Sequence, residues 1–80
     1  MKRKVYLVYE VVFINDKFMY DTDRCFFTSK NAAALWLERE KIRRINHGWT
    51  ICDEDLKNCT FVAKRNESIS RFNLWSGIPQ

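Results

Sequence analysis

The sequence is poor in the residues that build phosphate loops and catalytic centres. Its 80 residues include two glycines, one proline and one histidine. The glycines, Gly48 and Gly77, are isolated, which excludes a glycine-rich phosphate-binding loop. The single histidine, His47, has no surrounding signature that would pair it with a nucleophilic serine or cysteine. These absences argue against catalysis, and we expect a protein that is not an enzyme.

The cysteines do not follow a metal-binding or disulfide pattern. Cys25, Cys52 and Cys59 contain no C-x2-C pair that would hold two thiolates on one zinc ion. The N-terminal residues MKRK lead directly into a strand-like run, without the cleavage site of a signal peptide. We therefore expect a cytoplasmic protein with reduced thiols and without a metal or cofactor.

The strand-like run at 5–14 is too short to span a bilayer, and it contains Glu10. Hydrophobic residues still make up 46% of the chain, with six Phe, three Tyr and three Trp that bury large areas. This composition predicts one folded domain, 1–80, with a core formed by about 4–64 and a C-terminal tail at 65–80.

The N-terminal pattern predicts a β-hairpin. Residues 4–14 carry a wholly apolar face at odd positions and a mixed face at even positions, which favours a strand in the middle of a sheet. Asn15 and Asp16 suit a tight turn because both tolerate a left-handed backbone. The returning strand ends at Phe27, and residues 21–23 are expected to interrupt it or to form a bulge.

A single helix is expected at 28–47. Thr28 or Ser29 can cap its start, and Gly48 suits the left-handed residue that follows its end. Glu40 and Arg44 have the i,i+4 spacing of a helical ion pair.

Short strands are then expected at 49–52 and 59–64, with an acidic loop at 53–58 between them. The tail at 65–80 has apolar residues every third position and could form a short helix. The expected fold is α+β: an antiparallel sheet of about four strands, ββαββ, with one helix on one face.

The face that this helix buries is left open by the pattern. One interpretation buries Leu37, Ile42 and Ile45, which leaves Trp36 exposed between arginines as a contact residue. The other buries Ala33, Trp36 and Leu37. The candidate contact surface combines basic helix residues with aromatic residues of the tail: Trp36, Arg39, Arg43, Arg44, Phe72 and Trp75.

Residues 4–63 resemble small proteins of tailed bacteriophages that begin K-V-Y-x-V-x-E and continue through a hairpin into F-[ST]-[ST]-x-x-x-A and a helix. The matching positions are Lys4-Val5-Tyr6, Glu10, Phe27-Thr28-Ser29 and Ala33. The resemblance implies an early phage protein that binds and inhibits a host enzyme or defence system, such as a toxin ribonuclease.

Two functions follow from these observations. The first is a non-enzymatic inhibitor or adaptor in the host cytoplasm that binds a host protein, for example a nuclease, a toxin or another nucleic-acid-processing factor. The alternative is a small module that binds RNA or single strands through the same basic and aromatic residues. A free strand edge, or the tail, would also allow a homodimer.

Overall fold

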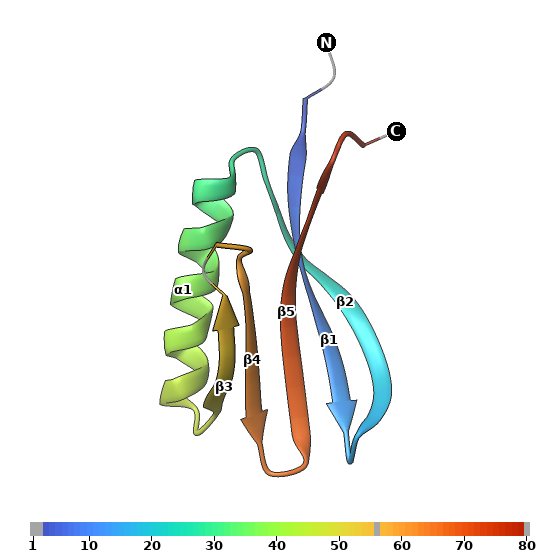
Figure 1. Ribbon diagram of the computed structural model, residues 1–80, viewed down its shortest axis with the longest axis vertical. Helices are drawn as coiled ribbons and strands as arrows, with labels where there is room; N and C mark the ends of the chain where they lie inside the picture. The colour runs from blue at the N-terminus through green and yellow to red at the C-terminus, as the bar shows by residue number, and fades with distance from the viewer. Residues whose placement is uncertain (1–2, 56, 80) are drawn as a thin grey trace.

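The computed structural model describes residues 3–55 and 57–79 and is an α+β fold with one helix against an antiparallel sheet (Figure 1). Within these residues the elements are β1 (Val5–Ile14), β2 (Lys17–Phe27), α1 (Lys30–Asn46), β3 (Thr50–Asp55), β4 (Thr60–Arg65) and β5 (Ser68–Gly77). The strand order across the sheet is β2-β1-β5-β4-β3, and every neighbouring pair is antiparallel.

The region expected to be a tail is instead the central strand of the sheet. β5 pairs with β1 on one side and with β4 on the other, so the described residues form five strands rather than four. The spacing of Ile69, Phe72 and Trp75 suggested a helical turn, but a strand alternates its side chains between faces. Phe72 therefore points into the core, while Ile69 and Trp75 lie on the other face. Hydrogen bonding of β5 to β1 and to β4 outweighs the three-residue spacing of its apolar side chains.

The acidic segment is also different from the expectation. Asp53, Glu54 and Asp55 belong to β3 at the edge of the sheet and are not part of a loop. Glu54 pairs with Phe61 of β4, and Cys52 is an extra residue in the ladder, since Ile51 and Asp53 oppose consecutive residues of β4. An edge strand tolerates this composition because one of its sides faces solvent.

The predicted N-terminal hairpin is confirmed. Asn15 and Asp16 both have positive φ, 53° and 63°, as a two-residue turn between β1 and β2 requires. β2 continues through residues 21–23, and the ladder shifts immediately afterwards, at Arg24. A bulge increases the local twist and redirects side chains. Here it places Arg24 on the α1 side of the sheet, where its guanidinium reaches Glu10 of β1.

The predicted helix ends are confirmed as well. Ser29 is the N-cap, and its hydroxyl accepts a hydrogen bond from the Ala32 amide at 3.1 Å. Gly48 follows the helix with φ 86°, and its amide donates to the Ile45 carbonyl. A left-handed residue at this position is strained for any side chain, which explains the glycine.

The structure decides between the two helix faces in favour of the one that contains Trp36. Ala33, Leu37 and Glu40 are buried, and half-buried Trp36 packs against Phe72 with ring centroids 6.2 Å apart. The buried apolar cluster contains Val8, Ala33, Leu37, Cys59, Phe61, Ala63 and Phe72. The interpretation that buried Ile42 and Ile45 is wrong, because both side chains are about half exposed.

Replacing Leu37 with alanine is expected to lower the free energy of unfolding by about 2–5 kcal/mol, because the change opens a cavity beneath α1. The matched change Ile42→Ala, on the exposed side of the same helix, is expected to cost less than about 1 kcal/mol. Urea denaturation followed by circular dichroism measures both. Equal losses in the two variants would mean that α1 buries the other face.

Candidate functional site

The four predicted contact residues on α1 lie in different environments. Arg39 is exposed, and within the described residues it makes no ion pair. The Arg43 side chain is 57% exposed but donates to both carboxylate oxygens of Glu40 at 2.7 Å. Trp36 is half-buried, and Arg44 keeps only 14% of its side chain exposed. Arg39 and Arg43 are thus the accessible members of this group.

The two predicted aromatic residues of the tail are separated by the sheet. Phe72 is fully buried and stacks on Phe61 at a centroid distance of 4.5 Å, so it cannot contact a partner of the folded protein. Trp75 is 46% exposed and lies on the opposite face of β5. The strand conformation separates two residues that the helical interpretation had placed together.

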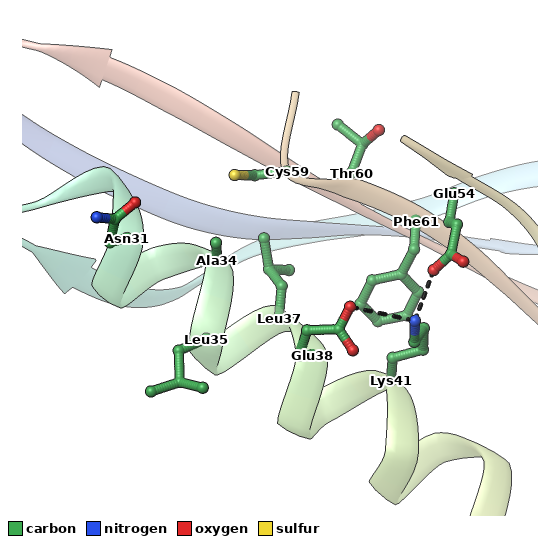
Figure 2. Close-up of a pocket in the computed structure, with 10 residues that line it drawn as sticks. All are labelled: Asn31, Ala34, Leu35, Leu37, Glu38, Lys41, Glu54, Cys59, Thr60 and Phe61. Carbon is green, nitrogen blue, oxygen red and sulfur yellow. Dashed lines mark hydrogen bonds and ion pairs between the residues drawn. The ribbon is translucent and has the colours of Figure 1, made fainter. Parts of the chain in front are cut away.

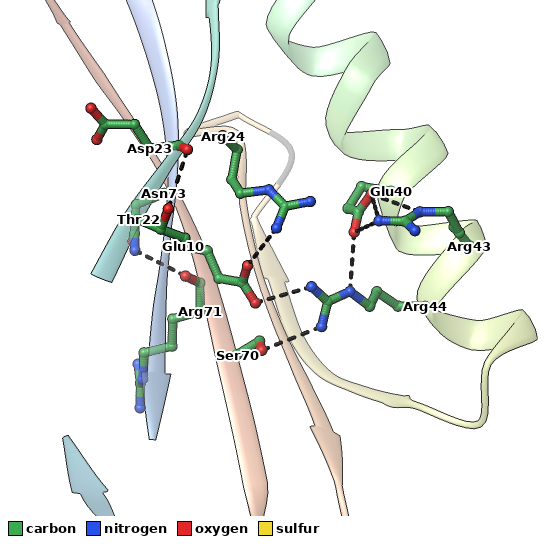
Figure 3. A network of polar contacts seen from close by, with 10 residues as sticks. All are labelled: Glu10, Thr22, Asp23, Arg24, Glu40, Arg43, Arg44, Ser70, Arg71 and Asn73. Carbon is green, nitrogen blue, oxygen red and sulfur yellow. Dashed lines mark hydrogen bonds and ion pairs between the residues drawn. The ribbon is translucent and has the colours of Figure 1, made fainter. Parts of the chain in front are cut away.

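A buried ionic network fills the space between the C-terminal half of α1 and the sheet (Figure 3). Arg44 donates to Glu10 of β1 at 3.0 Å, to Glu40 of α1 at 3.0 Å and to the Ser70 hydroxyl of β5 at 3.3 Å. Arg24 of β2 supplies a second cation to Glu10 at 3.1 Å. Glu10 and Glu40 are only 4% and 5% exposed, so each carboxylate depends on these partners.

The network changes the acidity of Glu40. Burial would raise the pKa of this carboxyl, but hydrogen bonds from Arg43 and Arg44, together with their positive charges, outweigh burial and lower it. The carboxylate therefore stays ionised to a lower pH in the folded protein than in the unfolded chain. Glu40 acts as a structural anion, since its oxygens already accept hydrogen bonds from two guanidinium groups.

A second ion cluster joins α1 to the edge strand. Lys41 donates to Glu54 of β3 at 2.7 Å and to Glu38 at 3.3 Å. The hydrogen bond to Glu54 raises the pKa of Lys41, against the opposite effect of partial burial, and Glu38 adds to the increase. The basic cluster predicted on α1 is therefore largely neutralised by carboxylates of the same chain, with Arg39 as its exception.

The outer face of α1 presents an apolar stripe to solvent. Leu35, Ile42 and Ile45 are 53%, 53% and 50% exposed. Leu35 and Ile42 lie opposite the core, Ile45 lies on the adjoining flank, and the 41% exposed side chain of Glu38 lies on the same face. Arg39 lies along one edge of this stripe. Exposed apolar side chains are ordinary when scattered, but several on one helix face form a surface suited to a partner. We call Leu35, Arg39, Ile42 and Ile45 the outer surface of α1.

A groove lies beside the outer surface of α1, between the helix and β4 (Figure 2). It has a volume of about 420 Å³, and its walls are mainly apolar, with Ala34 and Leu37 on the helix and Phe61 on β4. Lys41 and Glu54 form its polar end, where their ion pair lies. The groove extends the apolar surface of α1 towards the sheet.

The helix-free face of the sheet is the feature that sequence reasoning did not assign. α1 covers the mixed face of β1, where Val8, Glu10 and Val12 are buried. The wholly apolar odd face of β1 is left without a helix. Glu10 could have indicated which face of β1 the helix covers. A carboxylate on the mixed face can be buried only with cations, and Arg44 supplies one from the helix.

A basic hollow of about 420 Å³ lies around Trp49, at the C-terminal end of α1. The guanidinium groups of Arg44 and Arg65 lie over the Trp49 ring at 4.8 and 5.0 Å from its centroid. Arg65 also donates to the His47 carbonyl at 3.1 Å. Both cations near the ring are thus held by cation–π contacts, which limits stacking of a base on Trp49.

In 3–55 and 57–79, no three His, Cys, Asp or Glu side chains lie close enough together to hold a metal ion. Across the same residues, no helix combines the length and apolar character needed to cross a membrane. Comparison with protein-family models, curated proteins and solved structures finds no match to this chain.

The lowered pKa of Glu40 predicts a specific acid sensitivity. A carboxyl whose pKa is lower in the folded state stabilises the fold above its ordinary pKa of about 4.5, and this stabilisation is lost as pH falls through the lowered value. We expect the Glu40 carboxyl carbon to titrate in NMR spectra with a midpoint below 4.5. We also expect Glu40→Gln to lower the free energy of unfolding by about 1.5–3 kcal/mol at pH 7. The loss at pH 3 should be smaller.

The control for this experiment is Glu38→Gln, because the Glu38 side chain is 41% exposed and its one ion-pair partner among residues 3–55 and 57–79 is Lys41. Its effect on stability should be below about 1 kcal/mol at both pH values. A Glu40 midpoint at or above 4.5 would show that burial outweighs the two arginines.

Proposed function

We propose that this protein is a non-enzymatic inhibitor or adaptor that binds another protein through the outer surface of α1. The observation that carries the proposal is the exposed apolar stripe of Leu35, Ile42 and Ile45 on the side of the helix away from the core. Apolar side chains that remain in water are stabilised when a partner buries them, so such a stripe favours association with another protein. The adjacent groove would accept apolar side chains of the same partner.

The cations beside the stripe favour an acidic partner, because the carboxylate on the same face, Glu38, is paired with Lys41. Arg39 has no carboxylate within the described part of the chain, and Arg43 is more than half exposed although it pairs with Glu40. The chain carries a net charge of +4, which speeds association with anionic surfaces. The partner we propose therefore presents apolar residues flanked by Asp or Glu.

The resemblance of residues 4–63 to small phage proteins supports a partner in the host cell. Inhibition by such a protein requires occupation of a surface, not chemistry, and the outer surface of α1 has the composition for that role. We propose that the partner is a host nuclease, toxin or other nucleic-acid-processing or defence factor in the cytoplasm.

Direct binding of RNA or single-stranded DNA is the second candidate, and the basic hollow around Trp49 favours it. Three of the arginines that line this hollow are already paired: Arg24 with Glu10, Arg43 with Glu40, and Arg44 with both carboxylates. Arg65 is the remaining cation, and it is held against Trp49. The internal pairing leaves few free charges for phosphate, so we rank this function below protein binding.

Capture from a nuclease-treated bacterial host lysate tests protein binding. The immobilised protein is expected to retain one stoichiometric partner. Ile42→Glu and Ile45→Glu are expected to weaken that complex more than about 30-fold, because each places a carboxylate in an apolar contact beside an acidic partner. Surface plasmon resonance with the purified partner measures the change, and Arg39→Glu should slow its association rate.

The matched control is Ile78→Glu, which changes an isoleucine of similar exposure, 54%, outside α1. It should leave the affinity unchanged, and circular dichroism should show all variants folded. A partner that binds Ile42→Glu and Ile45→Glu as tightly as the unchanged protein would exclude the outer surface of α1 as its site.

A gel shift with labelled single-stranded RNA at low salt tests the second candidate. Nucleic-acid binding predicts an affinity that falls steeply with salt, and a slope reduced by Arg65→Ala. The proposed protein-binding role predicts no complex at physiological salt. A salt-dependent complex that Arg65→Ala weakens would reverse the order of the two functions.

A further inference from the structure

The face of the sheet away from α1 carries a continuous apolar surface. On β1 it contains Leu7, Tyr9, Val11 and Phe13, all half-buried. Their neighbours across the ladders include the exposed rings of Phe18, Phe26 and Trp75 at 59%, 60% and 46%. No element of the described chain covers these side chains, and in Figure 1 α1 lies against one side of the sheet only. We call these seven residues the open face.

The area of the sheet face that carries these residues is close to the area that each partner buries in a stable complex. The accessible surface of the chain is 5762 Å², whereas the scaling for monomeric proteins of its mass gives about 5,100 Å². The excess is consistent with a two-layer molecule in which one side of the sheet is bare. From strand spacing and rise, the sheet face measures about 700 Å², close to the roughly 800 Å² that each partner buries in a standard complex.

The sheet edges are poorly suited to association, which leaves the face. β2, at one edge, has ladder irregularities at Met19 and at Arg24. β3, at the other edge, has one at Cys52 and carries three consecutive acidic residues. Bulges and charges at edges are the usual obstacles to strand addition. A partner strand would meet an irregular or repulsive edge on either side.

The charges on the helix-free side of β2, β5 and β4 are arranged in two separate rows, and Asp53 of β3 lies beyond them, opposite Val62. Asp21 and Asp23 lie on β2, opposite Val11 and Tyr9 of β1. Arg71 lies on the other side of Val11, on β5, and Lys64 follows on β4, beside Ile69. Figure 3 shows Arg71 directed away from α1. An apolar strand thus separates an acidic row from a basic row, and no ion pair joins the two rows within the described residues.

We propose that the occupant of the open face is a second copy of this chain, packed face to face as a β-sandwich. A two-fold axis parallel to the strands, between β1 and β5, places β5 of one copy over β1 of the other. The same operation places β4 over β2. Arg71 then lies at the level of Asp21 in the other copy, and the reciprocal pair forms by symmetry.

A hollow in this face fits the proposed contact. It has a volume of about 490 Å³ and is lined by Leu7, Tyr9, Phe26 and Trp75, with Asp21 and Asp23 at its rim. An arginine side chain has the matching form, with an aliphatic stem for the aromatic walls and a guanidinium for the rim carboxylates. Arg71 of the second copy enters from the opposing β5. Among the described residues of its own chain, this guanidinium lies over Phe13, 5.8 Å from the ring centroid, and makes no ion pair.

The arrangement leaves both helices on the outside of the dimer. The outer surfaces of α1 would then point in opposite directions, so the dimer presents two identical contact surfaces. The inference does not depend on the proposed function, because the open face and the outer surface of α1 lie on opposite sides of the molecule. It adds a bivalent form of the protein, in which two weak contacts can act together.

Sedimentation equilibrium over about 1–100 μM protein tests the dimer. The expected mass at high concentration is twice the 9.7 kDa of one chain. Trp75→Lys and Arg71→Glu are each expected to weaken self-association more than about 30-fold, since the first places a charge in the aromatic contact and the second opposes Asp21. The double exchange Asp21→Arg with Arg71→Glu restores the ion pairs across the two-fold axis and is expected to recover the dimer.

Arg39→Glu is the control, because it changes a charge on the outer surface of α1 and should leave the dimer mass unchanged. Circular dichroism confirms that each variant is folded. A monomer mass across the whole concentration range would overturn the proposal, as would a dimer that Trp75→Lys and Arg71→Glu leave intact. Failure to recover the dimer in the double exchange would exclude the proposed symmetry.

Discussion

The ion pair between Arg44 of α1 and Glu10 of β1 determines which side of the sheet the helix covers. Glu10 is almost completely buried beside Val8, and a carboxylate in that position requires a cation with good geometry. Arg44 provides it from the last turn of α1, and the guanidinium also reaches Glu40 and Ser70. With this network in place, the helix lies over the mixed face of β1. The wholly apolar face of β1 therefore lies on the side of the sheet that α1 does not cover.

That choice explains why this small domain has apolar surfaces on both of its outer sides. Trp36 and Leu37 turn inward with Arg44, so Leu35, Ile42 and Ile45 turn outward. On the sheet side, nothing in the described chain covers the open face. A layered fold with one helix can bury only one face of its sheet and one face of the helix. The uncovered surfaces are the features on which both proposed associations depend.

The central position of β5 is the second constraint. This strand joins the N-terminal hairpin to the β3–β4 hairpin, so the two halves of the sequence form one sheet. It places Phe72 at the centre of the core, between Trp36 and Phe61, and directs Trp75 to the opposite face. A residue in the core and a residue on the surface therefore come from the same short segment. The separate roles of these two aromatic residues follow from the strand conformation, which directs them to opposite faces of the sheet.

Local signals in the sequence were enough to predict the Asn15-Asp16 turn, the Ser29 cap, the Gly48 helix end and the Glu40–Arg44 pair. Turns and caps depend on the backbone preferences of a few adjacent residues, which composition reveals. The buried face of α1, the fifth strand and the extension of β3 through Asp55 became clear from the folded chain alone. Those features depend on ladders and on ion pairs between residues far apart in the chain, such as Glu10 and Arg44, and no local pattern records such partners.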